Sequence, residues 1–206
     1  MGEPDNKAFW QRFARLYAPA MKKSAPLYEE LCRWMTLRLS PDMEVLELAC
    51  GSGQLSFPLA PLVHSWTATD FSEAMIAEAE KRPAPAQLHF AVRDATALPE
   101  ADGSFDAVVI ANALHIMPHP EQALREIFRV LKPGGLLLAP TFIRPGNTAG
   151  ALRMKIMGLG GFRTYHSWDG ETFPAFLQGQ GFTVEKAQVM GGGMMPLCYA
   201  EARKPF

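Results

Sequence analysis

Short apolar runs alternate with helix-like segments from residue 44 to residue 139, and this alternation constrains the fold more than any other feature of the sequence. The runs at 44–50, 66–69, 88–92, 105–111 and 136–139 have the length and composition of buried strands. Helices between successive strands are typical of a parallel sheet that is covered on both faces. Two later runs, 182–190 and 194–202, predict a closing antiparallel hairpin around three glycines.

The two segments before the first strand have apolar residues at helical spacing. One face of the first helix is expected to consist of Phe9, Phe13, Leu16, Tyr17 and Ala20. Pro19 is expected to bend or end this helix near Ala18, since proline cannot donate the next backbone hydrogen bond. The second helix is expected to bury the stripe Leu27, Leu31, Trp34 and Met35.

The later helices begin and end at recognisable residues. Ser72 can cap a helix that carries Ala74, Met75, Ile76 and Ala79 and that ends by Pro83 and Pro85. Pro120 can open a helix whose apolar stripe runs to Leu131. The segment 132–135, Lys-Pro-Gly-Gly, is expected to end that helix. Residues 171–178 also have helical character, whereas 144–168 show no clear period.

Length, charge and cysteine content limit the class of protein. A chain of 206 residues fits one domain that folds without disulfides or metals, and a net charge of −1 disfavours nucleic-acid binding. Cys32, Cys50 and Cys198 show neither metal-site spacing nor a disulfide framework, which favours reduced thiols and a cytoplasmic location. The acidic, polar start predicts no signal peptide, and no apolar run is long enough to predict a transmembrane segment.

A glycine turn follows the first predicted strand, and carboxylates stand at three strand ends. Gly51 and Gly53 allow the backbone to turn tightly and to approach a ligand closely. Asp70, 17 residues beyond Gly53, ends the second strand, where an acid can accept hydrogen bonds from ribose hydroxyls. Asp94 follows the third strand and can accept from an adenine amino group. With Glu47 on the first strand, these acids predict a rim that suits a cationic nucleoside better than a pyrophosphate.

A dinucleotide-binding enzyme is the main alternative on this type of sheet. Its fingerprint has a third glycine that permits close helix–strand packing, and Ser56 occupies that position here. The missing glycine and the carboxylate of Glu47 both disfavour a nicotinamide or flavin enzyme.

Five stretches, in order, resemble class I S-adenosylmethionine-dependent methyltransferases, especially the group that includes ubiquinone and menaquinone biosynthesis methyltransferases. These stretches are residues 45–53, 68–72, 93–95, 104–109 and 126–135. The resemblance implies an α/β, Rossmann-like, doubly wound and mostly parallel sheet of seven strands, with the last strand antiparallel. It also implies S-adenosylmethionine as cofactor and methyl transfer to a small-molecule acceptor.

The resemblance assigns one group of residues to the adenosine end of the cofactor. Asp70 is expected to hold the ribose, and Phe71 to pack beside the adenine. Asp94 and Ala95 are expected to bind the edge of the adenine ring.

A second group is assigned to the methionine end. Glu47, Gly51 and Gly53 are expected beside the amino-acid arm, with Asn112 near the sulfonium. Tyr17 can reach the cofactor carboxylate, because the N-terminal helices of relatives fold over the cofactor. The single domain, residues 1–206, is thus expected to comprise a helical lid (1–40), a cofactor-binding core (42–142) and a substrate-facing segment with the closing strands (144–206).

Residues that act on the acceptor are less defined. His115, in the loop after the fourth strand, is a candidate general base, with a packing role in that loop as the alternative. His119 is expected to start the next helix, and Tyr165 and His166 are candidates for the acceptor pocket. A methionine group predicts either an adaptable pocket or core packing, and it consists of Met154, Met157, Met190, Met194 and Met195. A non-catalytic, cofactor-binding regulatory protein is the alternative to an enzyme.

Overall fold

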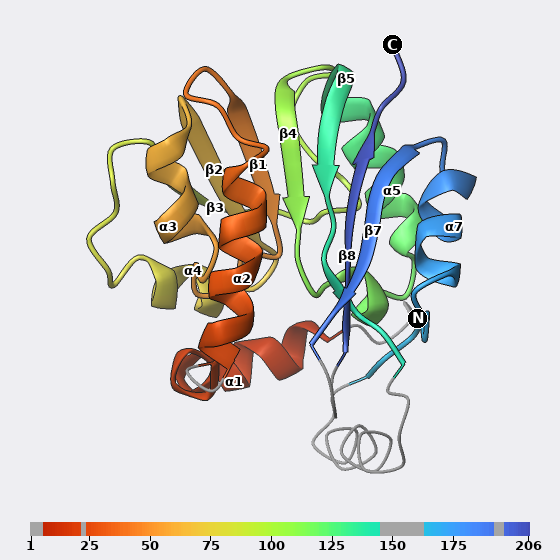
Figure 1. Ribbon diagram of the computed structural model, residues 1–206. Coiled ribbons are helices and arrows are strands. Elements are labelled where there is room, and N and C mark those ends of the chain that lie inside the picture. The colour runs from red at the N-terminus through yellow and green to blue at the C-terminus, as the bar shows by residue number, and fades with distance from the viewer. Residues whose placement is uncertain (1–5, 22–23, 145–162, 192–195) are drawn as a thin grey trace.

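A computed structural model describes residues 6–21, 24–144, 163–191 and 196–206 (Figure 1). Two helices, α1 (Lys7–Met21) and α2 (Ala25–Thr36), precede the sheet. The parallel strands are β1 (Glu44–Leu48), β2 (Ser65–Asp70), β3 (Leu88–Val92), β4 (Phe105–Ile110) and β5 (Leu131–Leu138). The helical segments between them are α3 (Ser56–Leu59), η2 (Ala60–Leu62), α4 (Glu73–Ala79), η3 (Leu114–Ile116) and α5 (Pro120–Val130). The remaining elements are β6 (Thr141–Phe142), α7 (Thr172–Gly179), β7 (Thr183–Met190) and β8 (Leu197–Arg203).

The strands form one sheet in the order β3-β2-β1-β4-β5-β8-β6, with β7 also paired to β8. The strands β1 to β5 are parallel to one another, and β8 is antiparallel to β5, β6 and β7. This order confirms the doubly wound, mostly parallel α/β fold. The eighth strand, the short β6, was not predicted, and only its pairing with β8 defines it as a strand. The strand order reverses between β1 and β4, where ligands of such sheets bind beyond the strand ends.

Helices cover both faces of this sheet (Figure 1). On one face, the buried side chains of Leu31 and Met35 from α2 pack with Val45 of β1. On the other face, Leu124 and Ile127 of α5 pack with Leu46 of β1, and α7 joins the same cluster. The alternation along β1 therefore sends neighbouring residues into two separate cores.

The first helix buries a different face from the one predicted. Ala14 is buried, whereas Phe13 is 36% exposed and Leu16 is 63% exposed, so the predicted stripe was wrong for Phe13 and Leu16. The rings of Phe9 and Phe13 stack on each other, with their centroids 4.3 Å apart. The helix also continues past Pro19 to Met21. Figure 1 shows α1 across the end of the sheet to which the arrowheads of β4 and β5 point.

The boundary between α5 and β5 also differs from the prediction. The helix ends at Val130, and Leu131 already has extended backbone angles. Residues 132–135 follow the end of the helix, as predicted, and form an irregular stretch of β5, where the register with β4 shifts between Leu131 and Leu136. Backbone bonds hold this part of the strand, because Gly134 donates to the carbonyl of Lys204 and Lys204 donates to the carbonyl of Gly135. The C-terminal segment needed for these bonds is remote in sequence.

Several local predictions are confirmed. The hydroxyl of Ser72 accepts a hydrogen bond from the amide of Met75, and Pro120 occupies the first turn of α5 directly after His119. The hairpin β7–β8 is antiparallel as expected. In the described ranges, no helix combines the length and apolar character needed to cross a bilayer.

Candidate functional site

The turn after β1 requires residues without a side chain. Gly51 and Gly53 have φ values of +57° and +83°, in the left-handed region that favours glycine. A Cβ on Gly51 would lie 3.0 Å from the ring of Tyr17, and one on Gly53 would lie 2.7 Å from the ring of Phe57. Ala49 also has a positive φ of 55°, which is costly for a residue with a Cβ. The turn is therefore tight, and its backbone lies close to the ring of Tyr17 with no side chain between them.

Asp70, at the end of β2, fastens this turn to the neighbouring one. Its Oδ2 accepts a hydrogen bond from the amide of Gly51, and its Oδ1 accepts one from the amide of Ser72, both at 2.9 Å. Burial raises the pKa of the Asp70 carboxyl, while these amide donors oppose the shift. Asp70 thus has a structural function in addition to the predicted binding function.

Asp94 lies after β3 with one oxygen available. Its Oδ1 accepts hydrogen bonds from the amide of Thr96 at 2.9 Å and from the Thr96 hydroxyl at 2.7 Å. Within the described part of the chain, Oδ2 of Asp94 has no hydrogen-bond donor. A ligand N–H can therefore be accepted there without breaking an existing bond.

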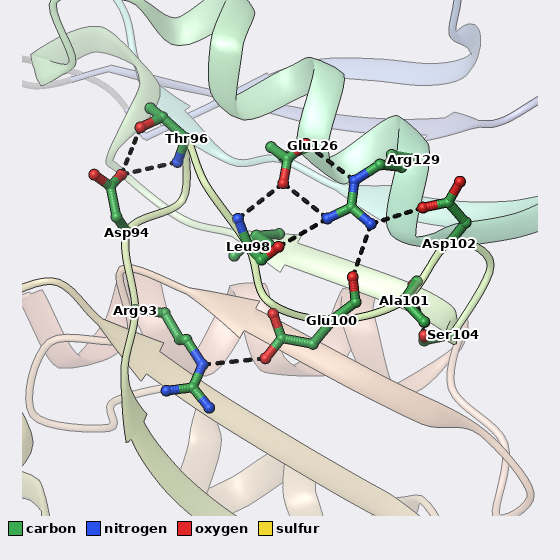
Figure 2. Close-up of polar contacts among 10 residues, drawn as sticks. All are labelled: Arg93, Asp94, Thr96, Leu98, Glu100, Ala101, Asp102, Ser104, Glu126 and Arg129. Carbon is green, nitrogen blue, oxygen red and sulfur yellow. Dashed lines mark hydrogen bonds and ion pairs between the residues drawn. The ribbon is translucent and has the colours of Figure 1, made fainter.

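Side chains of α5 hold the loop that carries Asp94 in place (Figure 2). The guanidinium of Arg129 donates to the carbonyl of Leu98 at 2.9 Å and to the carbonyl of Glu100 at 2.7 Å. Glu126 accepts from the amide of Leu98 at 2.8 Å and pairs with Arg129. Because the N–H and the carbonyl of Leu98 both bond to side chains of α5, the loop is held at a fixed distance from this helix.

A cavity of about 250 Å³ lies at this edge of the sheet. It is lined from the ends of β1 to β4, from α1, and from the loop between β4 and α5. Of the residues predicted for the cofactor, seven line this cavity, namely Tyr17, Gly51, Asp70, Phe71, Asp94, Ala95 and Asn112. The structure thus brings most of the predicted site to one place.

Two tyrosines connect the N-terminal helices to the end of β4. Asn112, with a φ of +54° that asparagine tolerates, donates from Nδ2 to the hydroxyl of Tyr28 at 3.2 Å. Tyr28 also hydrogen bonds with Tyr17, and burial raises the pKa of both phenols. No function could be predicted for Tyr28, because its partners come from distant segments.

Glu47 and Gly53 are not among the residues that line the cavity. The Glu47 side chain points under the turn, where its Oε2 accepts from the hydroxyl of Ser56 at 2.5 Å and from the indole of Trp66 at 2.8 Å. Burial raises the pKa of Glu47 to about 7 despite these donors. Glu47 therefore supports the floor of the site.

His115 does not line the cavity either. Its buried ring lies edge-on to Phe142, and Nδ1 is 3.1 Å from the hydroxyl of Thr141. Burial lowers the pKa of His115 to about 4, so the ring is neutral near pH 7. Its carbonyl accepts from the amides of Tyr165 and His166. These contacts are those of a packing residue and give no support to a general-base role.

Other residues of the cavity wall escaped the sequence analysis. They include Asn6 and Trp10 before and on α1, together with Ile116, Met117, His119 and Gln122 around the start of α5. The position of His119 in the loop that follows β4 was the available signal. Tyr165 and His166 are not among the lining residues, and Met190 is buried in the core. The other four methionines lie outside the described residues.

Comparison with known proteins shows which proteins this chain resembles. A family model described as a methyltransferase domain matches residues 45–135. A demethylmenaquinone methyltransferase of Renibacterium salmoninarum is 44% identical over 105 residues, which cover 51% of this chain and 44% of that protein. The chain therefore matches less than half the length of this curated relative.

Two solved structures share the fold. A putative methyltransferase of Haloferax volcanii, in complex with the activator Trm112, is 16% identical with a TM-score of 0.80 and full coverage of both chains. Magnesium protoporphyrin IX methyltransferase of Synechocystis with bound S-adenosylhomocysteine is 20% identical with a TM-score of 0.70, covering 88% of this chain and 83% of that one. With the sheet order, these findings show that residues 45–135 match a methyltransferase domain and that the chain has the fold of methyltransferases of known structure.

Proposed function

We propose that this chain binds S-adenosylmethionine at the carboxyl edge of its sheet and transfers the methyl group to a small-molecule acceptor. The observation that carries the proposal is the cavity at the strand-order reversal, which the carboxylates of Asp70 and Asp94 and the turn at Gly51 all line. This combination suits a nucleoside with a positively charged arm.

Residues at the ends of β2 and β3 are proposed to hold the adenosine. Asp70 is the acceptor for the ribose hydroxyls, and Phe71 is the apolar partner of the adenine. The free Oδ2 of Asp94 is suited to an amino group, with the amide of Ala95 beside it as a donor. The clamp from Arg129 supports this assignment, because it fixes the loop that presents Asp94.

Residues at the ends of β1 and β4 are proposed to hold the amino-acid arm. β1 and β4 adjoin in the sheet, so an arm extending from the β2 side passes the turn at Gly51 and then Asn112. Tyr17 covers that turn from α1. Glu47, beneath the turn, contributes negative charge when deprotonated rather than direct contact.

The chain's contribution to methyl transfer is then orientation and exclusion of water. The bound cofactor supplies an activated methyl group. The protein holds donor and acceptor in line, and α1 shields the cavity with Trp10 and Tyr17. The acceptor is proposed to enter where Trp10, Ile116 and Met117 form an apolar wall. We assign no proton transfer to His115, whose ring lies outside this wall.

Each of the three parts of the domain is proposed to have its own function. Residues 1–40 are proposed as the cover of the cofactor, 42–142 as the binding core, and 144–206 as the part that selects the acceptor and closes the sheet. The relative named as a demethylmenaquinone methyltransferase supports an apolar ring compound as the first acceptor class to assay.

Calorimetry with S-adenosylmethionine and S-adenosylhomocysteine tests the cofactor proposal, and methyl-labelled cofactor with a panel of quinols, phenols, amines and lipids tests transfer. We expect binding of both nucleosides and transfer to at least one acceptor. Binding without transfer across the panel would favour the regulatory protein. Failure to bind either nucleoside would reject the proposed site itself.

A further inference from the structure

We propose that Asn6 is a positioning residue that fastens α1 over the cavity and thereby slows exchange of the cofactor. The inference rests on the proposed function only for the identity of the ligand, since the fastening itself belongs to the free protein. Asn6 directly precedes α1 and lines the cavity, and its side chain is only 4% exposed.

The carboxamide of Asn6 joins α1 to two other segments. Its Nδ2 donates to the carbonyls of Ile116 and Arg163, both at 2.9 Å. Its Oδ1 accepts from the amide of Arg163 at 3.0 Å. Both amide hydrogens and the oxygen are therefore used, and the pair of bonds to Arg163 imitates the pairing of two backbone strands.

The two segments that Asn6 reaches are bonded to each other, and one of them lines the cavity. Ile116 is part of the loop between β4 and α5 and lines the cavity. The segment after Arg163 is itself bonded to this loop, through the amides of Tyr165 and His166 to the carbonyl of His115. Asn6 therefore holds α1 to the cavity wall at Ile116 and to the segment at Arg163 that is bonded to the same loop.

Another attachment of α1 lies on the α4 side. Lys7 pairs with Glu73 at 3.0 Å, Gln11 bonds to the same carboxylate, and the amide of Ala74 donates to Gln11 at 3.1 Å. The ion pair is exposed, and exposed ion pairs contribute little. The Asn6 bonds are sheltered, and breaking them leaves buried polar groups without partners. The Asn6 bonds are consequently a stronger polar attachment of α1 than the exposed Lys7–Glu73 pair.

Since Trp10 and Tyr17 line the cavity from α1, any movement of this helix changes the shielding of the ligand. Releasing Asn6 should affect dissociation more than association, because most interface changes act on the dissociation rate. This outcome distinguishes a fastening from a direct contact with the reacting atoms, which would alter the chemical step.

The test uses the full chain with S-adenosylhomocysteine as probe. For Asn6→Ala we expect a dissociation rate raised about tenfold or more, with the melting curve still cooperative. Arg12→Ala is the matched control, because Arg12 is an exposed residue of the same helix, and its rate should stay within about twofold. Rates for Asn6→Ala within about twofold of the wild type would overturn the inference.

Asn6→Asp supplies a readout that general destabilisation would not give. The charged carboxylate would face the carbonyls of Ile116 and Arg163 without a proton to donate, whereas the protonated acid regains one donor. We therefore expect the affinity of this variant, relative to the wild type at the same pH, to recover on acidification. The Ala variant should show no such recovery, and equal pH profiles for the two would contradict the proposed bonds.

Hydrogen exchange on the free protein separates this inference from the proposed function. In Asn6→Ala, amides of α1 should exchange about tenfold faster, while those of α2 should not change. If the wild type bound no nucleoside, the proposed function would fail, but this measurement would still decide whether Asn6 fastens α1. Unchanged exchange in α1 would overturn the inference.

Discussion

The backbone amide of Gly51 donates a 2.9 Å hydrogen bond to Oδ2 of Asp70, so the turn after β1 is tied to the end of β2. The carboxylate proposed to bind the ribose is therefore also part of the scaffold of the turn. A substitution at Asp70 removes both functions together, whereas the Asp94 side chain lies exposed on its loop and, among the described residues, bonds only to Thr96. This difference separates binding from scaffold effects.

Replacing Asp70 with Ala should weaken cofactor binding by about 100-fold or more and lower the free energy of unfolding by about 1–3 kcal/mol, because two buried amides lose their acceptor. Replacing Asp94 with Ala should weaken binding while changing stability by less than about 0.5 kcal/mol. Calorimetry and urea unfolding of both variants check the two effects. Unchanged affinity in Asp70→Ala would contradict the ribose assignment.

Replacing Ala49 with Gly should stabilise the protein by about 0.5–1 kcal/mol. Ala49 has a φ of +55°, where a Cβ costs about 1–2 kcal/mol, and glycine recovers most of this cost less its larger entropy in the unfolded chain. Urea unfolding measures the change. Ala60→Gly is a suitable control, because Ala60 has ordinary helical angles and should lose stability instead.

Replacing Glu47 with Gln should remove a pH dependence of stability. Burial raises the pKa of Glu47 from its usual 4.5 to about 7, so the folded state keeps a proton that the unfolded state releases. The free energy of unfolding should therefore fall as pH rises from about 4.5 to about 7, by at most about 3 kcal/mol. The free energy of unfolding of the Gln variant minus that of the wild type should therefore be larger at pH about 8 than at pH about 5. A constant difference between the two proteins across this range would refute the assignment.

Replacing His115 with Asn should remove a pH dependence of stability whose sign is opposite to that from Glu47. Burial lowers the pKa of His115 from 6.5 to about 4, so the unfolded state gains a proton first as the solution is acidified. The wild type should lose up to about 3 kcal/mol between pH 6.5 and 4 from this group, and the variant should not. Exposed His89, replaced with Asn, is the control.

The same His115 variant also tests the earlier general-base hypothesis. A residue that transfers the acceptor proton would cost about 100-fold or more in the rate of methyl transfer when removed. We expect a smaller loss, because the ring of His115 lies outside the cavity wall.

Residue order fixed the elements whose signals are local. The apolar runs located β1 to β4 within about two residues, and Ser72 and Pro120 located the starts of α4 and α5. Asp70 and Asp94 could be assigned to one edge because parallel strands present their carboxyl ends together. These features follow from backbone geometry and need no knowledge of distant contacts.

Contacts between distant segments decided the rest. The buried face of α1 depends on the cavity wall it covers, and Lys132–Gly135 became strand because the C-terminal segment pairs with it. Glu47 points at Ser56 and Trp66, and Asn6 reaches Arg163 across 157 positions of sequence. The free energy of a buried hydrogen bond or a packed face comes from its partner, and a pattern within one segment carries no information about a partner so far along the chain.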